Sequence, residues 1–223
     1  MKICYLFPAD MRRSAAGEAE LERRGSVLQS WAGSGVLVGC LDLPGGPPFR
    51  GAYHEEYLAV AGTLERVREA AAQGYDAVVL GSLAGSVLEA EEPPAIPVVG
   101  PGEAAMLVAA MMGRGFSLLT LAEEAVPHLR HLAAAAGVAQ KLWSVRAAGL
   151  GPAELARNPQ EGERRLEAVA REVLSEPVSP DVLVLGCLSL GFLGVAESLS
   201  RALGVPVLNP ARISLKMAEL LAG

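Results

Sequence analysis

The chain has 223 residues, of which 51% are hydrophobic and 20% are charged. This composition excludes an intrinsically disordered protein, and the length allows one large domain or two small ones with proper cores. The formal net charge of −6 argues against nucleic acid or an anionic membrane as a partner, because both repel an acidic surface.

Cysteines are sparse, and the chain contains only Cys4, Cys40 and Cys187. They are far apart and form no CxxC pair, so the sequence predicts neither a disulfide framework nor a zinc site. The apolar run at residues 3–7 is too short for the core of a signal peptide. No apolar run approaches the about 20 residues of a membrane span. We therefore expect a soluble, cytoplasmic protein.

Short apolar runs alternate with amphipathic stretches along the whole chain. Strands are expected at residues 3–7, 36–41, 77–81, 97–99, 116–120, 142–146, 182–186 and 206–208. Helices are expected at residues 18–31, 54–73, 103–112, 123–136, 161–174, 189–203 and 211–221, with a further short helix ending near residue 92. Segments 44–51 and 148–158 are expected to be loops that shape a pocket. This order predicts parallel sheets covered by helices on both faces.

One stretch occurs twice in the chain. Residues 76–83 read DAVVLGSL and residues 181–188 read DVLVLGCL, and a Pro-containing strand follows each copy, IPVVGP at 96–101 and VPVLNP at 205–210. A repeat spaced by half the chain predicts two similar domains related by a pseudo-twofold axis. Each would be a four-stranded parallel sheet flanked by helices. We assign residues 1–100 and the C-terminal helix 210–223 to the first domain, and residues 101–209 to the second.

The repeat ends in a residue that differs between its copies, Ser82 in the first and Cys187 in the second. In open parallel sheets the functional groups lie at the carboxyl ends of the strands. Both residues follow an expected strand directly. We therefore expect them to face each other in a cleft between the two domains.

Taken in order, several motifs resemble the aspartate/glutamate/hydantoin racemase superfamily, and most closely its hydantoin racemase branch. They are LGC at 185–187, IPVVGPGEAAM at 96–106, FSLLTL at 116–121 and SVRA at 144–147. The resemblance implies a cofactor-independent isomerase that acts at a carbon next to a carbonyl. Its substrate would be a small molecule, such as a hydantoin, an amino acid or a related carboxylate. Dimers are common in the superfamily, so a homo-oligomer stays open.

In that superfamily, one cysteine thiolate removes the proton beside the carbonyl and a second thiol returns a proton on the opposite face. The resemblance gives Cys187 this acid/base role, whereas Ser82 stands where the family has its first cysteine. Residues 83–86, which read LAGS, also lack the Asp-Pro-Gly that usually follows that cysteine.

Six further residues are assigned to substrate binding. Backbone N–H groups at Leu83, Ala84, Leu188 and Ser189 are suited to paired anion-binding turns. The resemblance adds Thr120 and Pro8, although this chain reads Phe7-Pro8-Ala9 where hydantoin racemases typically carry Asn-Pro-Asn.

Each assigned side chain has a structural alternative. The expected helix start after Cys187 would lower the pKa of its thiol, but a lone cysteine is also a common core residue. Ser82 could donate a hydrogen bond to a developing enolate or cap the helix that follows. Thr120 could equally cap the helix near Glu123.

Other candidates are interpreted as structural. Cys4 and Cys40 lie within apolar strand patterns and are expected in the core. His128 and His131 have a spacing that can bind metal, but without a third ligand a solvated helix face is the favoured interpretation. No metal site is predicted.

Two other functions stay open at this point. An arylmalonate decarboxylase-like lyase keeps only the second cysteine, which matches the presence of Ser82. A non-catalytic relative that has kept the ligand-binding cleft is the other alternative.

Overall fold

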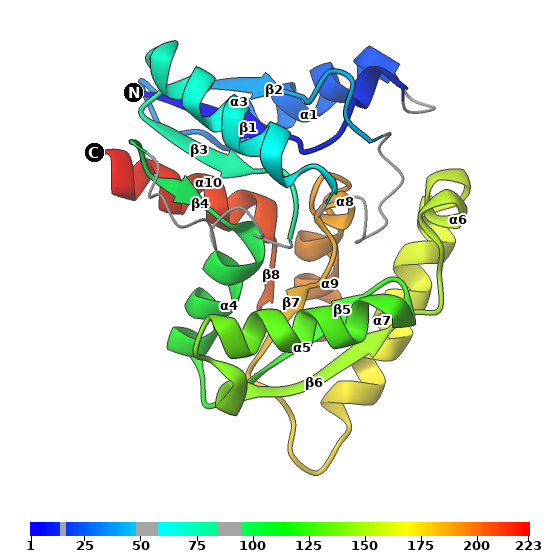
Figure 1. Ribbon diagram of the computed structural model, residues 1–223. Helices are drawn as coiled ribbons and strands as arrows, with labels where there is room; N and C mark the ends of the chain where they lie inside the picture. Colours follow the sequence, from blue (N-terminus) through cyan, green and yellow to red (C-terminus); the bar gives the residue numbers. More distant parts are fainter. Residues whose placement is uncertain (14–16, 48–57, 84–94) are drawn as a thin grey trace. The chain divides into compact units, whose positions relative to one another are not determined.

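The computed structural model describes residues 1–13, 17–47, 58–83 and 95–223 (Figure 1). The chain divides into two compact units. The first comprises Met1–Pro101 together with Ala211–Gly223, and the second comprises Gly102–Pro210. The chain therefore passes from one unit to the other twice, at Pro101 and at Pro210, and each crossing coincides with the first residue of a helix.

The first unit contains four parallel strands in the order β2-β1-β3-β4. The strands are β1 (Lys2–Leu6), β2 (Leu37–Leu41), β3 (Ala77–Leu80) and β4 (Val98–Val99). The helices are η1 (Met11–Arg13), α1 (Gly17–Trp31), α3 (Val60–Ala72) and α10 (Pro210–Ala222). Alternate residues of β1 point to opposite faces of the sheet, as successive side chains of a strand do. Cys4 and Leu6 pack with Val67 of α3, which runs over β1 and β3 in Figure 1.

The second unit repeats this arrangement, with four parallel strands in the order β6-β5-β7-β8. The strands are β5 (Phe116–Thr120), β6 (Leu142–Ala147), β7 (Val182–Leu185) and β8 (Val207–Leu208). The helices are α4 (Pro101–Met112), η3 (Glu123–Ala125), α5 (Val126–Ala135), η4 (Ala139–Lys141), α6 (Pro152–Arg157), α7 (Pro159–Leu174), α8 (Leu188–Gly191) and α9 (Val195–Leu203).

The core of the second unit joins β5 and β7 to α7 and α9. Leu119 and Leu183 pack there with Leu166 and Leu199. Strands β5 and β7 are buried along their whole length. The predicted α/β class with two four-stranded parallel sheets flanked by helices is confirmed.

The helix expected at residues 189–203 is divided in two. It consists of the single turn α8 and the longer α9, with Gly194 between them in a left-handed conformation at φ +73°. A residue with this backbone conformation cannot continue a right-handed helix. The segment immediately after Cys187 is therefore one helical turn and not the start of a long helix.

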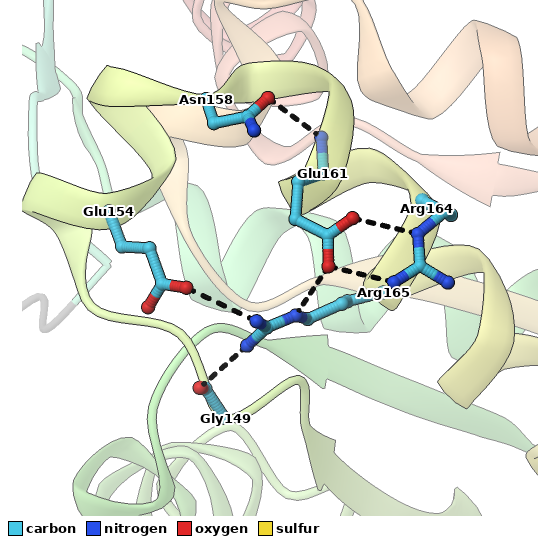
Figure 2. A network of polar contacts seen from close by, with 6 residues as sticks. All are labelled: Gly149, Glu154, Asn158, Glu161, Arg164 and Arg165. Atoms are coloured by element: carbon cyan, nitrogen blue, oxygen red, sulfur yellow. Dashed lines mark hydrogen bonds and ion pairs between the residues drawn. The ribbon is translucent and has the colours of Figure 1, made fainter.

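Residues 148–158 are expected to form a loop, but they contain the short helix α6. Polar contacts connect this segment to α7 (Figure 2). Arg165 of α7 lies 3.3 Å from a carboxylate oxygen of Glu154, and its Nη1 donates to the carbonyl oxygen of Gly149 at 3.5 Å. Arg165 also pairs with Glu161 at 2.9 Å. Asn158 begins α7 by accepting a hydrogen bond from the backbone N–H of Glu161 at 3.2 Å. These contacts hold the chain that follows β6.

Two predicted helical segments fall partly or wholly outside the described residues. Only the part of the helix expected at residues 54–73 that begins at Val60 can be described, as α3. The short helix expected before residue 92 lies outside the described residues.

Candidate functional site

The two copies of the repeat form the same backbone turn, each at the carboxyl end of its own sheet. The N–H of Gly81 donates to the carbonyl oxygen of Leu6, and the N–H of Gly186 donates to that of Leu119, both at 2.6 Å. A Cβ atom at Gly81 would lie 3.0 Å from the Leu6 oxygen, and one at Gly186 would lie 3.2 Å from the Leu119 oxygen. Glycine is thus required for the close approach, which places Ser82 and Cys187 directly at the strand ends.

Cys187 is half-buried and occupies the N-cap position of α8. Its backbone is extended, with φ −154° and ψ 125°, and Leu188 begins the helical turn. The dipole of a single turn is much weaker than that of a full helix, on which the expected effect on the thiol is based. Leu188 and Ser189 are the first two residues of that turn.

Ser82 and Leu83 are more deeply buried than Cys187, with exposed fractions of 8% and 6%. Ala84, the next assigned residue, lies outside the described residues. The same holds for the helix that Ser82 is expected to precede.

Thr120 contacts the turn of Cys187 from the neighbouring strand. Its exposed fraction is 2%, and its Oγ1 donates to the carbonyl oxygen of Gly186 at 3.3 Å. The alternative that Thr120 caps the next helix is wrong, because Ala122 is the N-cap residue of η3. Thr120 holds the residue immediately before Cys187 instead.

Pro8 follows β1 in the first unit and is half-buried. The preceding residue, Phe7, extends the strand pairing, since its N–H donates to the carbonyl oxygen of Leu41 at 2.8 Å. Its ring lies 5.4 Å from the guanidinium carbon of the buried Arg24 on α1. Pro8 is therefore the first residue beyond a well-anchored strand end.

Sequence reasoning missed two buried carboxylates at the same edge of the first sheet. Asp42 directly follows β2 and is 3% exposed, and Asp10 lies beyond β1 and is 7% exposed. Asp10 Oδ2 accepts a hydrogen bond from the N–H of Gly45 at 3.1 Å. In the part of the chain that the structure describes, Oδ2 of Asp42 has no hydrogen-bond partner. A buried charged oxygen without a donor is costly and marks a candidate ligand contact.

The remaining cysteines lie in the first unit. Burial raises the pKa of Cys4 to about 12, and burial also raises the pKa of Cys40 to about 12. Both thiols are therefore protonated at neutral pH, so neither supplies a thiolate base.

No group of three or more His, Cys, Asp or Glu side chains among the described residues is arranged to hold a metal ion. Over those same residues, the structure has no helix of the length and apolarity that a membrane crossing requires.

Comparison with known proteins shows which family the chain resembles. The family model for Asp/Glu/Hydantoin racemase matches residues 14–218. A hydantoin racemase of Rhizobium meliloti is 34% identical over 170 residues, which are 76% of this chain and 69% of the relative.

Among solved structures, an allantoin racemase from Klebsiella pneumoniae has a TM-score of 0.86 and 27% identity, over 99% of this chain and 87% of its own. An arylmalonate decarboxylase superposes with a TM-score of 0.61 at 18% identity, over 100% of this chain and 93% of its own, and so shares the fold. On the extent of the family match and the identity to the curated relative, the chain belongs to the Asp/Glu/Hydantoin racemase family.

Proposed function

We propose that the protein is a cofactor-independent racemase that acts on a hydantoin or a related small molecule at the carbon next to a carbonyl. The observation that carries the proposal is the position of Cys187, half-buried in a tight turn at the carboxyl end of β7. The names of the relatives support the reaction class. The active site would lie in a cleft between the two units.

In this mechanism the Cys187 thiolate removes the proton from the carbon and becomes a thiol, while the electron pair of the C–H bond moves into the carbonyl to form an enolate. The base has to lie close to the proton, and donors have to face the oxygen that gains charge. The N–H groups of Leu188 and Ser189 and the hydroxyl of Ser82 are suited to this second task. Return of the proton from Cys187 restores the starting enantiomer, and protonation from the opposite face inverts it.

In this proposal, proton transfer is slower on the face of the substrate next to Ser82 than on the face next to Cys187. A hydroxyl is a far weaker acid than a thiol, so it protonates an enolate less readily than the cysteine that the family carries there. We therefore expect exchange of the substrate proton with solvent to be faster than inversion.

The buried carboxylates of the first unit favour a substrate that carries N–H donors. Asp42 and Asp10 lie at the strand ends on the same edge of the sheet as Ser82. A carboxylate accepts hydrogen bonds from ureido or imide N–H groups and repels a dianion. This charge pattern supports a hydantoin-type substrate over an arylmalonate.

One observation favours a second candidate, a lyase that decarboxylates an arylmalonate and protonates the enolate from one face. Ser82 leaves Cys187 as the single thiol among the assigned catalytic residues, which matches a one-sided protonation. A relative that binds a ligand without catalysis is the third possibility.

A panel of single-enantiomer hydantoins, amino acids and aryl-malonates incubated in D2O separates the three candidates. Deuterium incorporation with loss of optical rotation for a hydantoin supports the racemase. Release of CO2 with an enantiopure deuterated product supports the lyase. Ligand-induced stabilisation without exchange or decarboxylation supports the binding protein and overturns the proposal.

A further inference from the structure

The single helical turn after Cys187 is held at its far end by a buried asparagine. Asn209 directly follows β8 and has an exposed fraction of 5%. Its Nδ2 donates to the carbonyl oxygen of Gly191, the last residue of α8, at 3.0 Å. The C-terminal carbonyls of a helix have no partner within the helix. Asn209 supplies a donor to one of them, which also accepts a longer hydrogen bond from the N–H of Gly194 at 3.5 Å.

The approach of these two residues leaves no room for a side chain. A Cβ atom added to Gly191 would collide with Oδ1 of Asn209 and lie 3.2 Å from its Nδ2. Gly191 is itself buried. A side chain at residue 191 would therefore displace the Asn209 amide from its present position.

The turn is anchored at both ends by side chains from other strand ends. Thr120, at the end of β5, donates to the carbonyl oxygen of Gly186, just before Cys187. Asn209, after β8, donates to that of Gly191, four residues beyond Cys187. One helical turn is unstable by itself, because a single turn gains too few hydrogen bonds to offset the entropy of ordering it. The two side chains add hydrogen bonds from outside the turn at both ends of residues 186–191.

The first unit carries a glycine at the position equivalent to Asn209. Strand pairing matches Val79 with Val99 and Val184 with Leu208, so Gly100 is the counterpart of Asn209. Glycine carries no side chain that could donate to the turn of Ser82. The side-chain donor at this position thus belongs to the unit whose turn carries a cysteine.

We propose that Asn209 is a positioning residue for Cys187, which fixes the thiol and the adjacent N–H groups relative to each other. This role rests on the proposed acid/base function of Cys187. A misplacement of about 1 Å at a reacting group costs on the order of 100-fold in rate. The Asn209–Gly191 hydrogen bond therefore contributes to turnover and not only to folding.

The test compares Asn209→Asp and Asn209→Ala with the control Ser200→Ala. The aspartate keeps the shape but replaces the donor with an oxygen that faces the Gly191 carbonyl. The control removes another side chain–backbone hydrogen bond close to β8, in which Ser200 Oγ accepts from the N–H of Val207 at 2.8 Å. Two quantities are measured, kcat on a hydantoin that the wild-type protein racemises and the pH dependence of Cys187 alkylation by iodoacetamide. Cys187→Ala supplies the alkylation blank.

We expect kcat to fall about 10- to 100-fold in Asn209→Asp and Asn209→Ala, with a smaller change in KM. The alkylation midpoint should move to higher pH, because a displaced turn stabilises the thiolate less. Ser200→Ala should change neither quantity. If the aspartate variant does not fold, Gly191→Ala, which displaces Asn209 but leaves its donor group, should produce the same two changes.

The positioning role is overturned if kcat and the alkylation profile of Asn209→Ala stay within about twofold of wild type, or if Ser200→Ala shifts both as strongly. Failure of the function itself would look different. In that case the wild-type protein would racemise no substrate of the panel, while the alkylation profiles would still report whether Asn209 controls the environment of Cys187.

Discussion

Ser82 and Cys187 occupy matching turns but differ in what their side chains can do. Both follow a glycine whose N–H is bonded to the adjacent strand, Gly81 to Leu6 and Gly186 to Leu119. A thiol can exchange a proton near neutral pH, whereas a hydroxyl is restricted to donating and accepting hydrogen bonds. The repeated backbone therefore carries a thiol in one unit and a hydroxyl in the other.

Replacing Ser82 with cysteine tests this asymmetry. In the racemase proposal, Ser82→Cys supplies the missing acid/base group, so inversion should accelerate by about tenfold or more, because general acid–base groups contribute on the order of 100-fold or more when well placed. The ratio of solvent exchange to inversion, followed by NMR and polarimetry in D2O, should fall towards one. In a one-cysteine lyase the same change would instead make the product less enantiopure, and that outcome would replace the racemase with the second candidate.

We expect the Asp42 carboxylate to lower the stability of the fold and to strengthen substrate binding. Asp42→Asn removes a buried charge whose Oδ2 has no partner among the described residues, so the free energy of unfolding should rise by about 1–3 kcal/mol. The KM for an N–H-bearing hydantoin should rise about tenfold, the effect of losing one charge-assisted hydrogen bond.

Asp10→Asn is the matched control for the effect on stability, because the Asp10 carboxylate already accepts from the N–H of Gly45. It should lower stability and not raise it. Urea denaturation and steady-state kinetics measure both quantities. An Asp42→Asn variant with lower stability and unchanged KM would show that this carboxylate serves the fold alone.

The positions of Ser82 and Cys187 could be predicted because a repeat with a terminal glycine marks a strand end. Asp42 and Asn209 could not be predicted in the same way. Nothing in their local sequence shows that they are buried at 3% and 5% exposure, since burial depends on packing between distant segments. The Thr120–Gly186 contact was missed for the same reason, as it joins two strands 66 residues apart in sequence.

At the scale of elements, two helices carry the same charged pattern in different surroundings. In α1, Glu20 pairs with Arg23 and Arg24 at 2.7 Å each, and the Arg24 side chain is 4% exposed. In α7, Glu161 pairs with Arg164 and Arg165, whose side chains are 71% and 39% exposed. A buried guanidinium that loses its partner is costly, whereas exposed pairs contribute little.

Glu20→Gln should therefore lower the free energy of unfolding by about 1.5–3 kcal/mol at neutral pH, and Glu161→Gln should lower it by clearly less. Burial raises the pKa of Glu20, but hydrogen bonds from Arg23 and Arg24 outweigh it and lower the pKa from 4.5 to about 2. A lowered folded-state pKa means that the stabilisation is complete above pH 4.5 and is lost as the pH falls towards 2.

Urea denaturation between pH 7 and pH 2.5 measures this effect. The difference between wild type and Glu20→Gln should shrink as the solution becomes acidic. A difference that stays constant with pH would contradict the ionic origin of the contribution.

Most elements could be predicted because their signals are local. Apolar runs define the strands, and Gly74 and Gly137, at φ +76° and +72°, follow α3 and α5 as expected for residues that end helices. The division of the helix after Cys187 depends on Gly194, which the sequence alone does not distinguish from an ordinary helical glycine. Helix α6 escaped prediction because it is only six residues long and is fixed by Arg165 of α7.

At the scale of the whole molecule, the two units repeat one strand order, with the first strand of each unit between its second and third. This order puts the ends of β1 and β3 side by side in the first unit and those of β5 and β7 side by side in the second. In each unit, the turn of the repeat therefore lies next to the end of the unit's first strand, β1 or β5. The duplication gives a chain of 223 residues two comparable turns, one in each unit.

Deuterium exchange by Cys187→Ala tests the central claim most directly. The substrate is the single-enantiomer hydantoin that the wild-type protein processes, incubated in D2O and followed by NMR for deuterium at the carbon beside the carbonyl. With the thiol removed, exchange and inversion should both fall at least about 1,000-fold, while circular dichroism and the unfolding midpoint stay close to wild type. Exchange at the wild-type rate in folded Cys187→Ala would contradict the account.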